Sequence, residues 1–436
     1  MPGRCRTMHE LIANLVQQNR SGAPVSVPSV CTSHPGVLTA CLDLAARREL
    51  AIIVEATSNQ VNQFGGYTGQ TPDQFADQVS RLAEKAEISR HQLVLGGDHL
   101  GPQCWRQMPA NEAMARAHQL VADYVRAGFT KIHLDCSMGC ADDSEPLSDE
   151  QVAERSAVLA ISCLDAADDP DLLCFVIGTE VPPPGGVVLL EDGAIPATTP
   201  AAVTETLAAH RAAFDAAGIS QVINQTVGLV VQPGVEFAAM SVSHFPAERE
   251  LAYRSVLDAW PALCLEAHST DYQKRAVFPA LAGAGFAFQK VGPALTFAWR
   301  QAIYALDHIR AALESSVPRL QMVMEQLMLA DNSSWHAHYG GDQEAQFIGR
   351  HFGLADRIRY YWPRPEAQQE INALLGQLAA RELPAPLLNQ FFADAIIEQA
   401  RRWPGGLVDG LITAQVQAAL EPYLQCPPTR ITEPQI

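Results

Sequence analysis

The sequence places two short clusters of residues where they could bind a divalent metal ion. Asp98 and His99 are adjacent, and a single alanine separates Glu266 from His268. Imidazole and carboxylate groups held on rigid elements are ligands that suit zinc. Residues two apart on a strand point to the same side, so Glu266 and His268 could converge on one ligand. Together with Glu180, the pattern predicts a divalent metal site, with zinc as the first choice and His99, Glu180 and His268 as its ligands.

The same segments offer carboxylates that could transfer protons. Asp98 adjoins a predicted metal ligand, and the charge of the metal could tune this carboxylate for proton transfer at a bound hydroxyl group. Asp135, Glu266 and Asp271 are further candidates for catalytic carboxylates. Each of them could instead be an ordinary structural carboxylate, such as the cap of a turn or helix.

These residues need a scaffold, and the chain between residues 25 and 313 alternates short β-branched runs with longer amphipathic stretches. This alternation is typical of an α/β protein. The runs predict eight strands, at 25–30, 51–55, 93–97, 131–135, 172–177, 221–232, 263–268 and 286–291. Eight repeated units favour a closed (β/α)8 TIM barrel over residues 1–316. Beyond it the pattern predicts a helical C-terminal extension over residues 317–436, with a poorly ordered tail from Cys426.

The candidate residues follow the predicted strands, and barrel enzymes carry their chemistry at the carboxyl ends of the strands. Ser269 and Thr270 follow the seventh predicted strand and Gly292 the eighth, where barrels often bind phosphate through backbone amides. Asn59 follows the second strand as a further candidate for substrate binding.

Two cationic side chains could contact an anionic substrate. Lys290 ends the eighth predicted strand, and a Schiff-base aldolase that uses this lysine as its nucleophile is the alternative interpretation. Arg357 belongs to the segment 357–362, which could fold an arginine over the barrel mouth. The same segment could also be an ordinary packed aromatic stretch.

Composition excludes several classes of protein. The 436 residues are 48% hydrophobic, enough for one large core with an appendage. We expect a cytoplasmic protein, because no apolar run approaches the roughly 20 residues of a membrane span and Met1 begins no secretory signal. A net charge of -18 argues against nucleic acid and anionic membranes as partners. A phosphorylated substrate would therefore need a locally positive site.

The candidate segments belong to longer blocks, at 55–69, 96–102, 133–135, 177–180, 231–237, 266–273, 290–298 and 356–362. Together they resemble the Z-subunit family of D-tagatose-1,6-bisphosphate aldolase, a divergent branch of the class II aldolases. The resemblance implies that Asp98 is the catalytic acid and that His99 and His268 are metal ligands. Class II aldolases carry another ligand histidine on the sixth strand, which this sequence lacks. Gln232 is a candidate substitute.

Two functions follow from the resemblance. In the first, the protein is an enzyme of galactitol and tagatose catabolism that interconverts D-tagatose 6-phosphate and D-fructose 6-phosphate at C4, by a retro-aldol and aldol route. In the second, it is a non-catalytic subunit that stabilises a class II D-tagatose-1,6-bisphosphate aldolase. Convergent acidic and histidine residues favour the enzyme, because a purely supporting subunit has no need of them. We also expect a homo-oligomer.

Overall fold

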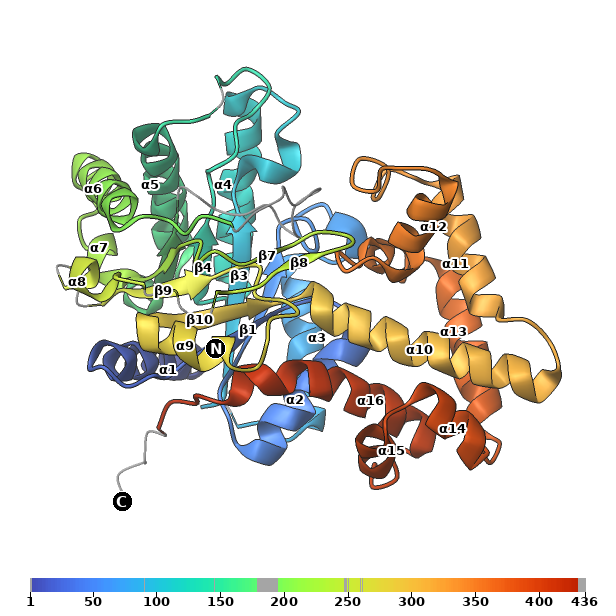
Figure 1. Cartoon of the computed structure of the whole chain (residues 1–436). Helices are drawn as coiled ribbons and strands as arrows, with labels where there is room; N and C mark the ends of the chain where they lie inside the picture. Colours follow the sequence, from blue (N-terminus) through green and yellow to red (C-terminus); the bar gives the residue numbers. More distant parts are fainter. Residues whose placement is uncertain are drawn as a thin grey trace.

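Eight parallel strands form a closed barrel in the computed structural model, which describes residues 2–89, 91–144, 146–178, 195–246, 249, 251–258, 260 and 262–429 (Figure 1). The barrel order is β1-β10-β9-β6-β5-β4-β3-β2. The strands are β1 (Val27–Cys31), β2 (Ile52–Thr57), β3 (Leu93–Leu100), β4 (Lys131–Leu134), β5 (Cys174–Ile177), β6 (Thr226–Val230), β9 (Cys264–Ala267) and β10 (Phe286–Val291). A separate hairpin pairs β7 (Glu236–Phe237) with β8 (Val242–Ser243). The predicted TIM barrel is confirmed.

One predicted strand is too long. Residues 221–232 read as a single run, but Val222–Gln225 form the short helix α7 and only Thr226–Val230 pair as β6. The backbone amides of Val222 and Ile223 bond to the carbonyls of Ile219 and Ser220. A local turn therefore overrides the β-branched character of these residues.

Helices surround the barrel and connect its strands. They are α2 (Pro35–Arg48), α3 (Pro72–Lys85), α4 (Ala110–Arg126), α5 (Asp149–Ala166), α6 (Pro200–Ala216), α8 (Arg254–Leu257), α9 (Val277–Ala284) and α10 (Pro293–Glu314). The sequence encodes their starts locally. Pro35 begins α2 after an N-cap, His34, whose ring accepts a hydrogen bond from the Val37 amide at 3.4 Å. Within the described residues, no helix combines the length and apolar character of a membrane span.

Helix α1 (Pro2–Arg20) covers the amino ends of the strands, opposite the predicted site. It contacts β3, β9 and β10. The buried side chain of Asn19 donates hydrogen bonds to the carbonyls of Val25 and Ala282, at 2.8 and 3.1 Å. Helix α1 therefore packs over this end of the barrel, opposite the carboxyl ends of the strands where the predicted site lies.

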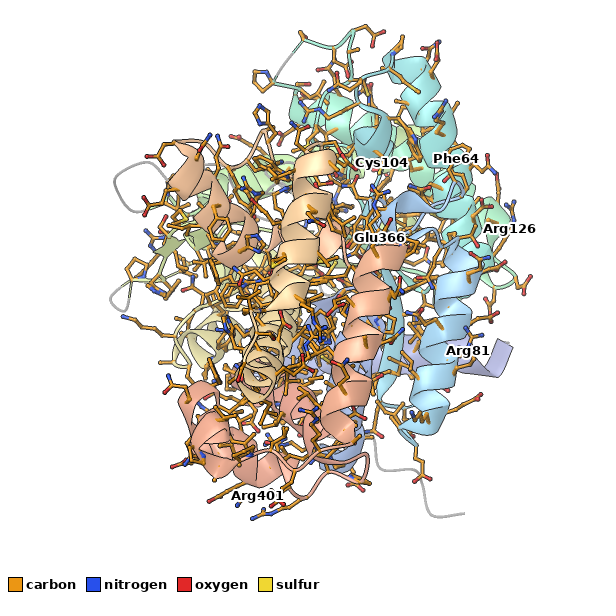
Figure 2. All side chains as sticks on the ribbon, turned by 90° about the vertical axis from the view of Figure 1, so that its right-hand side faces the viewer. Phe64, Arg81, Cys104, Arg126, Glu366 and Arg401 are labelled. Atoms are coloured by element: carbon orange, nitrogen blue, oxygen red, sulfur yellow. The ribbon has the colours of Figure 1, made fainter. Side chains whose placement is uncertain are left out.

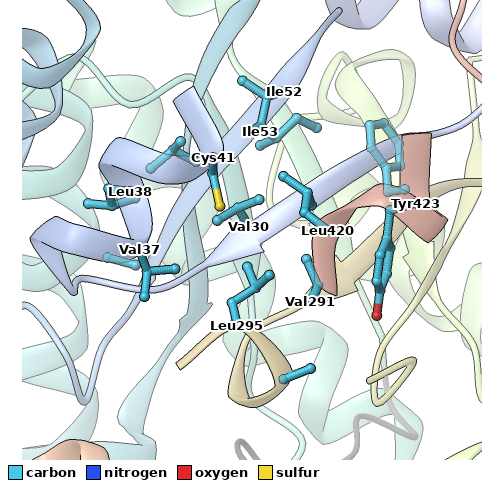
Figure 3. Packing of buried hydrophobic residues seen from close by; sticks show 14 of the residues in the cluster. Val30, Val37, Leu38, Cys41, Ile52, Ile53, Val291, Leu295, Leu420 and Tyr423 are labelled. Carbon is cyan, nitrogen blue, oxygen red and sulfur yellow. The ribbon is translucent and has the colours of Figure 1, made fainter. Parts of the chain in front are cut away.

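The chain beyond α10 is helical as far as it is described. It contains α11 (Arg319–Ala330), α12 (Gln343–Phe352), η4 (Arg357–Tyr360), α13 (Pro365–Ala379), α14 (Ala385–Phe391), α15 (Asp394–Ala400), α16 (Leu407–Leu420) and η5 (Glu421–Leu424). Helix α10 leads away from the barrel, and α16 runs back beside it (Figure 1). Leu420 and Tyr423 pack with Val30 of β1, Ile53 of β2 and Val291 of β10 (Figure 3). The extension and the barrel thus share one hydrophobic core.

The first residues of the predicted tail contact the barrel. The Cys426 carbonyl accepts from the Ser26 amide at 2.7 Å, and the Thr429 amide donates to the Gln18 side chain at 2.7 Å. The rest of that tail, residues 430–436, lies outside the described residues.

Candidate metal centre

A backbone irregularity at the end of β3 brings Asp98 and His99 to the same site. Neighbouring residues on a regular strand point to opposite faces, but the β3–β4 register shifts between Gly97 and Leu100. His99 adopts a left-handed φ of 48°, which is uncommon for a residue other than glycine. The next turn passes so close to β4 that a Cβ on Gly101 would lie 1.7 Å from the Asp135 carbonyl oxygen. The bulge directs both Asp98 and His99 inward.

Three imidazole rings meet at this site. The ring centroids of His99 and His133 are 5.1 Å apart, those of His99 and His268 are 5.1 Å apart, and those of His133 and His268 are 5.3 Å apart. The rings come from β3, β4 and the end of β9. His133 was not among the predicted ligands, although it stands two residues before Asp135 and so shares its face of the strand. It adds a third histidine to the two that the sequence predicts at this site.

The donor set fits a transition metal such as zinc. Ligand atoms of Asp98, His133, Glu266 and His268 all lie within 4.8 Å of one another. The Nδ1 atom of His133 lies 2.9 Å from Asp98 Oδ1, whereas its buried Nε2 has no hydrogen-bond partner among the described residues. Buried polar atoms are almost always paired, so the lone nitrogen is suited to a ligand. Nitrogen and oxygen donors of this kind are those that zinc sites use.

The surroundings set the protonation of two of the histidines. Burial, reinforced by Lys290, lowers the pKa of His268 to about 3, which keeps its ring neutral. Burial also disfavours charge on His99, but the carboxylates of Asp98 and Asp135 outweigh burial and raise the pKa of His99. Asp135 Oδ2 lies 2.7 Å from His99 Nδ1, and Asp135 Oδ1 accepts from Ser137 Oγ at 2.6 Å. Asp135 therefore orients His99 in the way that outer carboxylates orient metal-binding histidines.

A buried network of charges lies beneath the histidines. Lys131 Nζ is 2.6 Å from Glu55 Oε1 and 2.5 Å from Glu266 Oε2. Lys290 Nζ is 2.6 Å from Glu55 Oε2, 2.7 Å from Asp98 Oδ1 and 3.1 Å from Glu266 Oε1. Burial disfavours the ammonium of Lys290, but these carboxylates outweigh it and hold the pKa of Lys290 well above its usual value. A Schiff-base nucleophile must be a neutral amine, so this environment argues against that alternative.

Several predicted site residues line one small cavity of about 70 Å³ above the histidines. The predicted residues among its lining are Asn59, Asp98, His99, His268, Ser269, Asp271, Lys290 and Gly292. Ser269 has a left-handed φ of 54°, so the backbone is irregular on this side of the cavity as well. Such conformations cluster at functional sites.

Asp271 and Gly292 contact each other within the lining. Asp271 Oδ1 accepts from the Gly292 amide at 3.1 Å and from the Ala294 amide at 2.8 Å, at the start of α10. Burial raises the pKa of Asp271 to about 6. The amides that could bind a phosphate here already bind a carboxylate.

Other predicted residues lie away from the cavity. Gln232 Oε1 accepts from the Gly234 and Val235 amides at 2.8 and 2.9 Å and so stabilises a turn. The buried Thr270 hydroxyl donates to the Lys290 carbonyl at 2.6 Å. Glu180 lies outside the described residues, so its predicted role as a metal ligand has no structural description.

Arg357 also lies away from the cavity, and Arg359 takes the place predicted for it. The Arg357 Nε donates to the Ser334 carbonyl, and its guanidinium does not line the cavity. Arg359, two residues later in η4, lines the cavity together with Tyr360. The segment does fold over the barrel mouth, but the sequence carries no signal that separates the two arginines.

A larger groove of about 740 Å³ adjoins the cavity. Its lining includes residues of α2, α3, α10, α13 and α16. Figure 2 views this side of the molecule, where Arg81 marks α3 and Glu366 the start of α13. Thr32, Tyr67, Thr296 and Arg359 line both spaces. We call these four residues the neck.

Comparisons with known proteins agree on one family. The model of the family described as D-tagatose-1,6-bisphosphate aldolase subunit GatZ/KbaZ-like matches residues 12–427. The structure is similar to that of a probable tagatose 6 phosphate kinase from Sinorhizobium meliloti 1021. That likeness has 40% sequence identity and a TM-score of 0.82, and it covers 91% of this chain and 99% of that chain.

More distant likenesses include two other solved structures. A fructuronate-tagaturonate epimerase from Cohnella laeviribosi is 12% identical over 92% of this chain and 81% of that chain, with a TM-score of 0.48. A fructose-bisphosphate aldolase from Campylobacter jejuni is 12% identical over 83% of this chain and 90% of that chain, with a TM-score of 0.43. At TM-scores below 0.5, these two likenesses carry no argument about function.

Proposed function

The chain belongs to the D-tagatose-1,6-bisphosphate aldolase subunit GatZ/KbaZ-like family, and we propose that it is a cytoplasmic, zinc-dependent 4-epimerase of ketohexose phosphates. It would interconvert D-tagatose 6-phosphate and D-fructose 6-phosphate in galactitol and tagatose catabolism. The observation that carries the proposal is the convergence of His99, His133 and His268 beside Asp98, with one imidazole nitrogen that is buried and has no partner in the described part of the chain. A supporting subunit would gain nothing from that unpaired atom, which costs stability.

Asp98, His133, Glu266 and His268, whose ligand atoms lie within 4.8 Å of one another, would hold the metal, with His99 beside them. Bound there, a divalent metal supplies Lewis-acid stabilisation of negative charge that develops on substrate oxygens. Asp135 keeps the His99 ring in place, and the ammonium of Lys290 balances the negative charge of Asp98, Glu55 and Glu266.

Two carboxylates line the cavity, and their protonation differs. Burial disfavours charge on Asp98, but His99, Lys290 and His133 outweigh it and hold the pKa of Asp98 well below its usual value. Asp98 is therefore a weak base. The pKa of Asp271, raised to about 6, lies much closer to neutral pH, where an acid–base catalyst is most effective. We assign proton transfer at the C4 hydroxyl to Asp271 and charge balance at the histidines to Asp98.

In the reaction, Asp271 takes the proton of the C4 hydroxyl as the C3–C4 bond breaks. The C4 oxygen becomes the aldehyde of D-glyceraldehyde 3-phosphate, and the electron pair of the broken bond passes into the C2 carbonyl to give an enediolate. Rotation of the aldehyde then presents its other face. The enediolate carbon attacks that face, the C3–C4 bond forms again, and Asp271 returns the proton to the C4 oxygen. The configuration at C4 is inverted, and no atom is gained or lost.

A second candidate function is that of an aldolase subunit, the role that the family description records. One surface favours it. Val317, Met322 and Leu329 are 61%, 51% and 57% exposed at the start and along one side of α11. Apolar side chains that gather on an exposed face often mark a protein interface. The two functions do not exclude each other, because none of these three residues lines the cavity.

Incubation of the purified full-length chain with D-fructose 6-phosphate tests the epimerase directly. We expect D-tagatose 6-phosphate to form, formation to stop with a chelator, and activity to return with added zinc. A matched sample of His133→Ala should stay inactive after zinc is added. If the wild type converts neither sugar phosphate with any divalent metal, but raises the stability of an aldolase catalytic subunit on mixing, the second function is correct instead.

A further inference from the structure

The lysine and arginine side chains that line the catalytic cavity are Lys290 and Arg359. They differ in their partners. Lys290 is surrounded by the carboxylates of Glu55, Asp98 and Glu266. Within the described part of the chain, no carboxylate oxygen lies within 4.0 Å of the Arg359 guanidinium. Lys290 therefore forms ion pairs with carboxylates, whereas Arg359 forms none within the described residues.

The contacts of Arg359 hold its side chain without cancelling its charge. Nη1 donates to the carbonyls of Ala355 and Asp356 at 2.5 and 3.1 Å, and Nη2 donates to the Tyr360 hydroxyl at 3.1 Å. The guanidinium lies 4.6 Å from the Tyr360 ring centroid. The Asp356 carboxylate forms its ion pair with Arg300: its Oδ1 atom lies 2.8 Å from Arg300 Nε. A fixed and unneutralised guanidinium is suited to bind an anion such as a carboxylate or phosphate.

The position of Arg359 suits the phosphate end of a substrate. Ligand pockets usually measure about 300–1,000 Å³, whereas the catalytic cavity measures about 70 Å³ and the adjoining groove about 740 Å³. A ketohexose phosphate with its C4 near the histidines must therefore extend through the neck. Barrels also often bind phosphate after the eighth strand. In this protein the amides of Gly292 and Ala294 at that position already donate to Asp271, whose carboxylate would repel a phosphate.

We propose that Arg359 binds the phosphate of the substrate at the neck, where Thr32, Tyr67 and Thr296 also line the wall. The inference rests on the proposed epimerase function and adds the residue that selects phosphorylated over free ketohexoses. It also gives the helical extension a part in recognition, because η4 carries Arg359 over a site that the barrel strands build.

The test compares Arg359→Gln with the wild type on D-tagatose 6-phosphate and on D-tagatose. Hydrogen bonds to charged groups contribute about 1.5–3 kcal/mol, so we expect the KM for the phosphorylated sugar to rise about 10- to 150-fold. The kcat should change much less, and kcat/KM for the free sugar should stay within about twofold. The inhibition constant for inorganic phosphate should rise by a factor similar to that of the KM. Arg364→Gln is the control, because Arg364 is exposed and pairs with Asp331 outside the cavity.

Arg359→Lys keeps the proposal testable if the glutamine variant does not fold. Lysine retains the charge but not the two-pronged geometry, so its KM should be intermediate. An unchanged KM and unchanged phosphate inhibition in either folded variant would overturn the inference while the wild-type epimerase activity stands. The opposite result is also possible to recognise. In ³¹P NMR the wild type would bind inorganic phosphate and the Arg359 variants would not, although the wild type epimerises neither sugar. That result would keep the anion site and reject the proposed function.

Discussion

His133 completes the cluster of imidazoles at the centre of the barrel. Its Nε2 is buried and unpaired as far as the structure describes the chain, which makes His133 the most direct residue to test. Replacement by alanine removes one donor from the set of Asp98, His133, Glu266 and His268. We expect His133→Ala to bind zinc at least 100-fold more weakly and to lose epimerase activity. Metal analysis after dialysis against a weak chelator measures the first effect. His118→Ala on the barrel exterior should retain its zinc, and equal metal content in both variants would contradict the site.

Asp271 gives a prediction about pH. Its pKa is about 6 in the folded protein and near 3.8 in the unfolded chain, so the folded state holds the extra proton between these values. Stability from the protonated carboxyl is complete below pH 4 and is lost as pH rises through 6. The stability of the wild type relative to Asp271→Asn should therefore fall by roughly 2 kcal/mol from pH 4 to pH 7.

Urea unfolding of the metal-free proteins at both pH values measures that difference for Asp271. A constant difference would show that folding does not raise the pKa of Asp271. At pH 7 the same variant should lose about 100-fold or more in kcat if Asp271 transfers the C4 proton. Asp142→Asn, an acidic residue outside the cavity, provides the control for both measurements.

The residues of the site could be predicted from sequence only in part. Asp98, His99 and His268 could be found because they follow β-branched runs that read clearly as strands, and the carboxyl ends of such strands meet in a barrel. His133 lies inside its run, where a buried structural histidine gives the same pattern. Arg357 and Arg359 are two apart in a short 3-10 helix, and only the folded chain decides which guanidinium reaches the cavity.

At the scale of elements, the bulge that ends β3 decides the geometry of the centre. Gly101 allows the chain to pass against β4, because any Cβ there would lie 1.7 Å from the Asp135 carbonyl oxygen. We expect Gly101→Ala to cost about 1–3 kcal/mol in unfolding free energy. It should also weaken zinc binding, because the backbone must move away from the Asp135 carbonyl and this movement displaces both His99 and Asp135. Chemical denaturation and zinc titration measure the two effects.

Gly283 offers the matched control for Gly101. It lies in α9, and a Cβ at this position would meet no atom within 4 Å. Gly283→Ala should therefore be neutral or stabilise the protein by up to about 1 kcal/mol. Equal effects of the two substitutions would show that the close approach at Gly101 does not constrain the bulge.

The strands themselves were largely predictable, because each is a short buried run between turn residues. The boundaries of β6 were not, since Val222 and Ile223 have strand-like side chains but close a helical turn. The bulge at the end of β3 could not be predicted from the sequence either. A sequence of Gly-Gly-Asp-His-Leu-Gly is compatible with a turn or a regular strand end, and the choice depends on how closely β4 approaches.

At the scale of the molecule, α16 connects the extension to the barrel through Gln417. This buried amide donates to the Ala40 carbonyl at 2.9 Å and to Asp43 at 2.8 Å, and accepts from Arg47 at 2.8 Å. Gln417→Ala leaves the buried Ala40 carbonyl without this partner, so we expect a loss of about 1–3 kcal/mol in unfolding free energy. Gln415→Ala, which removes one exposed contact to Gln301, should change stability by less than about 0.5 kcal/mol.

The helical nature of the extension follows from its amphipathic runs and prolines, but its docking does not. Leu420 and Tyr423 complete a core begun by Val30 and Val291, far earlier in the chain. Contacts between segments so distant in sequence leave no periodic signal. Sequence reasoning therefore predicted the helical extension but not its packing into the hydrophobic core of the barrel.

The left-handed backbone at His99 and Ser269 lowers folding stability, so under the proposed function selection for activity and selection for stability should favour different residues at these two positions. Left-handed backbone costs a non-glycine residue about 1–2 kcal/mol, whereas asparagine and glycine adopt it readily. In relatives that no longer need the activity, we expect positions 99 and 269 to change to Asn or Gly. Laboratory selection for heat resistance alone should enrich the same replacements, which deep sequencing would reveal. Retention of histidine and serine in survivors that are never assayed for activity would argue that neither residue is strained.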